Sequence, residues 1–136
     1  MDDTAFFREV GQRLEVDKEG AQVVTSAVLW VLRSRLTGKQ AAHLDAQLPA
    51  RLKRFRPSGC SEPSATRFRE REFFRRVGIL ASLPAEEAQR ATRAVFKVLQ
   101  AALQSPTGHE GEAWDIFSQL PKDLKKIWSE AGRSST

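Results

Sequence analysis

The chain of 136 residues has one cysteine, no tyrosine and no apolar run longer than Ala27 to Leu32. A single cysteine excludes an intramolecular disulfide and fits a reducing compartment. The longest apolar run falls far short of the roughly 20 residues that a membrane-spanning helix needs. No basic patch followed by an apolar stretch comes after Met1, so no secretory signal is visible. We therefore expect a cytoplasmic protein with no membrane partner.

Residue patterns typical of a catalytic centre are also scarce. Cys60 is the only thiol, and it lies in the Ser-, Pro- and Gly-rich stretch 57–64, which would not hold a base beside it. His43 aligns with Asp115 in the internal repeat described below, so it belongs to no repeated pattern. We predict no catalytic residue, no cofactor and no enzymatic activity.

The acidic cluster after the second long helix is the best candidate for a metal site. His109 and Glu112 are spaced to share a helix face, and Asp115 follows one turn later. Such a site needs further ligands from facing helices, and the matching region of the first half offers mainly Lys39, Gln40 and His43. We therefore predict no bound metal and keep a metal protein or enzyme around His109 as the third hypothesis.

What the sequence does contain is an internal repeat. Residues 6–36 align without a gap on residues 73–103, and both copies are followed by a Gln-Leu-Pro step. A fixed offset of this kind is typical of duplicated architecture. Most of the identical residues are apolar and recur at three- and four-residue steps, which places them on one face of a helix.

The longest predicted helix of each copy starts near Asp17 or Pro84 and runs to about Leu36 or Leu103. Asp17 can accept hydrogen bonds from the amides of the first turn, and Pro84 suits the first helical position. The buried face of these helices is predicted to consist of Ala21, Val24, Val28, Val31, Leu32 and Leu36, repeated as Ala88, Ala91, Val95, Val98, Leu99 and Leu103.

A shorter helix is expected before each long one, with a matched pair of phenylalanines on its buried side. Gly11 and Gly78 lie at the same place inside these two helices. Glycine in a helix interior costs roughly 0.5 to 1 kcal/mol relative to alanine. Its presence in both copies predicts a close helix crossing.

Two short helices should follow each long one, separated by the Gln-Leu-Pro step because the residue before proline is pushed out of the helical region. Their predicted ranges are 39–47 and 52–55 in the first half, and 112–119 and 124–128 in the second. No alternating strand pattern is present. The predicted fold class is therefore all-α.

The predicted organisation is two duplicated four-helix units packed as one pseudo-two-fold helical bundle. The first repeat spans 1–56, a linker spans 57–65, the second repeat spans 66–130, and a flexible tail spans 131–136. A unit of some 50 residues folds only marginally alone, so the halves should pack into one compact domain.

Three stretches of the second half carry a resemblance: Phe73 to Val77, Glu87 through Val95, and Gly111 through Gln119-Leu120-Pro121 to Trp128. Together they resemble the small, duplicated, helical bacterial proteins catalogued as domain of unknown function 2267. The resemblance covers nearly the whole chain. It implies an all-helical bacterial cytosolic protein and carries over no catalytic residue.

Basic residues are concentrated where the two halves join. Between Arg51 and Arg76, nine basic residues stand against three acidic ones, within a chain of formal charge +5. Phe55 and Phe68 interleave with them, and basic and aromatic side chains together can bind phosphates and stack on bases. A solvated, helix-capping face is the simpler interpretation. The alternative hypothesis is a nucleic-acid-binding protein that uses Arg51, Lys53, Arg54, Arg56, Arg67, Arg69 and Arg71.

The two copies differ on the long helix at Val23 and Trp30, which become Arg90 and Lys97. Either the first long helix is more deeply buried there, which we favour, or Val23 and Trp30 form a partner interface. The leading hypothesis is a non-enzymatic helical interaction module, an adaptor or scaffold whose partner is a protein or a second copy of the chain.

Overall fold

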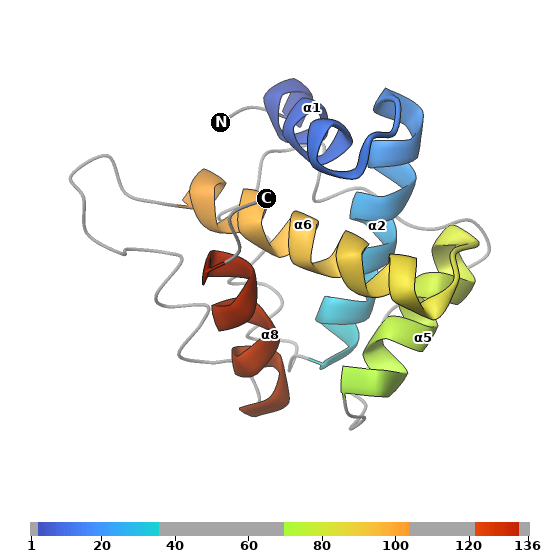
Figure 1. The fold of residues 1–136 in the computed structure, drawn as a ribbon, viewed down its shortest axis with the longest axis vertical. Coiled ribbons are helices and arrows are strands. Elements are labelled where there is room, and N and C mark those ends of the chain that lie inside the picture. The colour runs from blue at the N-terminus through green and yellow to red at the C-terminus, as the bar shows by residue number, and fades with distance from the viewer. Residues whose placement is uncertain (1–2, 36–69, 104–121, 134–136) are drawn as a thin grey trace.

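The computed structural model describes residues 3–35, 70–103 and 122–133. These residues form five α-helices, namely α1 (Asp3–Leu14), α2 (Lys18–Arg35), α5 (Glu70–Ala81), α6 (Ala85–Leu103) and α8 (Lys122–Arg133), as Figure 1 shows. The described part of the chain contains no strand, so the predicted all-α class is confirmed. The predicted helices 39–47, 52–55 and 112–119 and the linker lie outside the described residues.

The two long helices cross at the centre, and the shorter helices pack against them. α6 crosses α2, and α1 contacts both of these long helices. α5 likewise contacts both α6 and α2, while α8 packs mainly on α6 and touches α5 (Figure 1). Each long helix therefore contacts two shorter helices, one from each half of the sequence. Within the described ranges, none of the helices combines the length and apolar character needed to cross a bilayer.

The core is built from the repeated apolar face that the sequence predicts. Its described members are all buried, and they join the phenylalanines of the shorter helices in one cluster: Ala21, Val24, Val28, Val31, Leu32, Ala88, Ala91, Val95, Val98 and Leu99 with Phe6, Phe7 and Phe73. Phe73 meets the ring of Phe96 in an edge arrangement, with ring centroids 6.0 Å apart. Full burial of one such side chain contributes about 1.5 to 3 kcal/mol, so this cluster is the main source of stability.

α2 is buried on more of its circumference than the repeat predicts. Every residue from Val24 to Ser34 is buried, including the polar ones. The hydroxyl of Ser26 donates to the carbonyl of Val23 at 2.9 Å, and that of Ser34 donates to the carbonyl of Trp30 at 3.1 Å. These local hydrogen bonds let serine lie inside the protein without an unpaired donor.

The turn after each shorter helix has the same geometry in both copies. Glu15 and Ser82 have φ values of 57° and 58°, in the left-handed region. The next amide then bonds back to a glycine carbonyl: Val16 N–H to Gly11 at 3.0 Å, and Leu83 N–H to Gly78 at 2.8 Å. A left-handed residue followed by such a bond is the Schellman arrangement that ends many helices.

This turn explains both glycines. A Cβ on Gly11 would lie 2.8 Å from the carbonyl oxygen of Val16, and one on Gly78 would lie 2.6 Å from that of Leu83. The neighbouring long helix comes next, with the Cβ of Ala88 3.5 Å from the Gly78 position. The sequence predicts a close helix crossing at these glycines. The chain segment that comes closest to each glycine is instead the turn after its own helix, and the crossing long helix lies farther away.

The helix ends match the sequence at some positions and differ at others. Asp17 caps α2, since its Oδ1 accepts the Gly20 N–H at 2.7 Å. Pro84 lies one residue before α6 rather than at its first position, and its carbonyl accepts the Ala88 N–H at 2.8 Å.

α8 is longer than the predicted helix 124–128 and runs on to Arg133. Residues 131–133, predicted to belong to a flexible tail, are helical, and Ala131 is fully buried. Contacts between α8 and α6 include Arg93 with Glu130 at 3.0 Å, the Gln100 amide donating to the carbonyl of Trp128 at 2.8 Å, and the tilted rings of Phe96 and Trp128 with centroids 5.2 Å apart. These contacts extend the helix because they give its last turns a surface to pack on.

Candidate functional site

A groove lies where α2 packs against α5. It has a volume of about 270 Å³ and is lined by Trp30, Val31 and Ser34 of α2 and by Arg76, Ile79 and Leu80 of α5. Trp30 is 9% exposed and Val31 2%, so they form its floor. Ile79 is 63% exposed and forms an apolar wall. We call these six residues the α2–α5 groove.

The groove is apolar in a place where the other copy of the repeat is polar. The aligned residues, on α6 and α1, are Lys97, Val98, Ala101, Glu9, Gln12 and Arg13. α1 packs against α6 as α5 packs against α2, so the two surfaces occupy corresponding positions in the two copies. The indole of Trp30 is thus replaced by an ammonium group, and Ile79 and Leu80 are replaced by an amide and a guanidinium group. Of the two equivalent helix pairs, only α2 with α5 therefore presents an apolar groove.

The rim of the groove carries a shared ion pair. Nε of Arg76 donates to Oε2 of Glu72 at 2.9 Å, and Nη1 of Arg75 donates to the same oxygen at 3.0 Å. The hydrogen bond from Arg76, together with the charges of both arginines, holds the pKa of the Glu72 carboxyl below its usual value of 4.5. The Glu72 carboxylate therefore bonds to both arginines, and it holds Arg76 at the edge of the groove.

Val23 and Trp30 do not form one exposed strip. Val23 is 49% exposed and does not line the groove, whereas Trp30 is buried at its floor. Of the two alternatives for Trp30, burial or a partner interface, burial is what the structure shows, because α2 is buried around Trp30. The side chain that presents exposed apolar surface beside Trp30 is Ile79, which was not among the predicted site residues. Comparing the shorter helices of the two copies would have found it, because Ile79 aligns with Gln12 and Leu80 with Arg13.

Most of the predicted polar site residues lie outside the described residues. Arg71 is exposed on α5, but Arg51, Lys53, Arg54, Arg56, Arg67 and Arg69 are not described. His43, Cys60 and the metal candidates His109, Glu112 and Asp115 are not described either. Among the residues that the structure does describe, no group of three or more His, Cys, Asp or Glu side chains could hold a metal ion.

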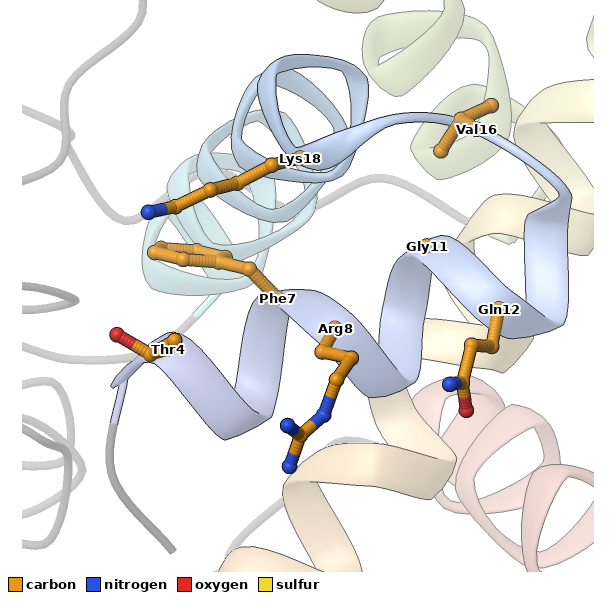
Figure 2. Close-up of a pocket in the computed structure, with 7 residues that line it drawn as sticks. All are labelled: Thr4, Phe7, Arg8, Gly11, Gln12, Val16 and Lys18. Atoms are coloured by element: carbon orange, nitrogen blue, oxygen red, sulfur yellow. The ribbon is translucent and has the colours of Figure 1, made fainter.

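A second hollow, of about 380 Å³, runs along α1 and the turn that follows it (Figure 2). Its lining consists of Thr4, Phe7, Arg8, Gly11, Gln12, Val16 and Lys18. Figure 2 shows Lys18 lying alongside the ring of Phe7 while Arg8 extends in another direction. Because the two cations do not converge on one point, this hollow is not a built site for a small anion.

Comparison with known proteins supplies a family. A family model described as "Uncharacterized conserved protein (DUF2267)" matches residues 3–127. The match includes both copies of the internal repeat and the first part of α8. No curated protein matches the chain.

Proposed function

We propose that this chain, which belongs to the DUF2267 family of uncharacterized conserved proteins, is a non-enzymatic helical interaction module, an adaptor or scaffold that binds a protein through the α2–α5 groove. The two halves are related by an approximate two-fold axis through the crossing of α2 and α6. The matched contacts of α1 and α5 with both long helices support that relation. The single cysteine supports a reducing bacterial cytoplasm as its location.

The observation that carries this proposal is that only one of the two equivalent helix pairs, α2 with α5, forms an apolar groove. Gln12 occupies the position of Ile79 in the other copy, so the fold accepts a polar residue there. A single exposed apolar side chain is common on protein surfaces and needs no explanation. Here Ile79 stands beside Leu80 over an indole floor, and together they make a hollow that a partner's apolar side chain can fill.

The contents of the groove favour binding over catalysis. Its lining is aliphatic and aromatic apart from one serine and one guanidinium group. The hydroxyl of Ser34 already donates to the carbonyl of Trp30, and Arg76 is bonded to Glu72. A volume of about 270 Å³ also lies below the roughly 300 to 1,000 Å³ typical of small-molecule sites. These features support recognition of a protein side chain.

The nucleic-acid alternative is less well supported by the described arginines. Arg75 and Arg76 both bond to Glu72, which reduces the charge that they offer to a phosphate. This pairing favours a structural role for these two residues. Binding to duplex DNA and RNA at low and moderate salt tests the alternative directly.

A comparison of three tagged proteins in the native host tests the proposal. The wild type, Ile79→Gln and Val23→Gln are purified under the same conditions, and the bound proteins are identified by mass spectrometry. Ile79→Gln installs the residue found in the other copy, while Val23→Gln makes the same kind of change at an exposed position outside the groove. We expect a partner that is retained by the wild type and Val23→Gln and lost by Ile79→Gln. Identical sets of bound proteins from all three would refute the groove as the docking surface.

A further inference from the structure

We draw no further inference here: the strongest candidate, the apolar α2–α5 groove with Ile79 exposed on its wall, carries nothing beyond the proposed function because nothing in the described residues shows what covers it.

Discussion

Adding one methyl group at Gly78 tests the account of the repeated turn. Alanine there would bring Cβ to 2.6 Å from the carbonyl oxygen of Leu83 and to 3.5 Å from the Cβ of Ala88. The oxygen belongs to the backbone, so no rotamer change can move it away. The amide of Leu83 is also bonded to the carbonyl of Gly78 at 2.8 Å, which holds the two residues together. Relief of the clash therefore requires the turn itself to open.

Two opposing contributions set the size of the effect. Alanine is favoured over glycine in a helix interior by about 1 kcal/mol. Overpacking costs about 1 to 3 kcal/mol, and weakening the bond between Leu83 and Gly78 costs about 1 kcal/mol more. The steric cost exceeds the propensity gain, so Gly78→Ala should lower the free energy of unfolding by about 1 to 3 kcal/mol.

Urea unfolding followed by circular dichroism measures this difference against three other variants. Gly11→Ala should cost somewhat less, because its Cβ would lie 2.8 Å from the nearest oxygen. Of the three glycine variants, Gly20→Ala should change stability least. The atoms nearest to its new Cβ are side-chain atoms of Asp17 and Val16 at 3.1 Å, and side chains can shift more easily than backbone. Ile79→Ala, on the exposed surface next to Gly78, controls for helix propensity. A Gly78→Ala protein as stable as the wild type would refute the steric role of the glycine.

Three further predictions concern strain, a buried hydroxyl and a titrating pair. Ser82→Gly should raise the free energy of unfolding by about 0.5 to 1 kcal/mol in urea melts, because a φ of 58° suits glycine better than serine; Ser82→Ala is the control, and a loss of stability in the glycine variant would contradict the left-handed geometry. Thr25 and its counterpart Thr92 are both fully buried, but only the Thr92 hydroxyl has a partner among the described residues, the carbonyl of Ala88 at 2.8 Å. Thr25→Val should therefore stabilise by about 1 kcal/mol and Thr92→Val should destabilise by about 0.5 to 1 kcal/mol, and the same sign for both in calorimetry would refute the difference. Arg76→Gln should raise the pKa of Glu72 toward 4.5 in an NMR titration of the carboxyl, and by more than Arg75→Gln does, since the hydrogen bond from Arg76 is the largest cause of the lowered pKa. The lower pKa is that of the folded state, so the stabilising contribution of the pair is complete above pH 4.5 and is lost as pH falls from 4.5 through the lowered value; an unchanged pKa in Arg76→Gln would contradict this assignment.

The duplication limits where a specific function can lie. Residues shared by the two copies are largely core residues or parts of the repeated turn, so fold stability accounts for them. Differences between the copies are not required by the common fold. The α2–α5 groove is such a difference, because Trp30, Ile79 and Leu80 are all polar in the other copy. The proposed function depends on this contrast.

Local patterns in the chain were sufficient for α1, α2, α5 and α6, for the core face and for one cap. The three- and four-residue spacing of Val24, Val28 and Leu32 predicts a buried helix face without knowledge of what covers it. Asp17 caps a helix through a residue three positions away, which is also a local relation. Such features follow from short-range geometry, and the described core agrees with them.

Positions that depend on a distant segment required the folded chain. The full length of α8 depends on its packing against the rest of the protein. Ala131 is part of the core cluster, and Glu130 pairs with Arg93 of α6. Burial of Trp30 cannot be read from helical spacing, because periodicity does not reveal how many faces of a helix are covered. The groove joins α2 of the first copy to α5 of the second, so neither copy contains it alone. Helix formation is governed by neighbours in sequence, whereas burial and grooves are governed by neighbours in space. The candidate site of this protein is a groove between two helices far apart in sequence, so only the tertiary structure decides it.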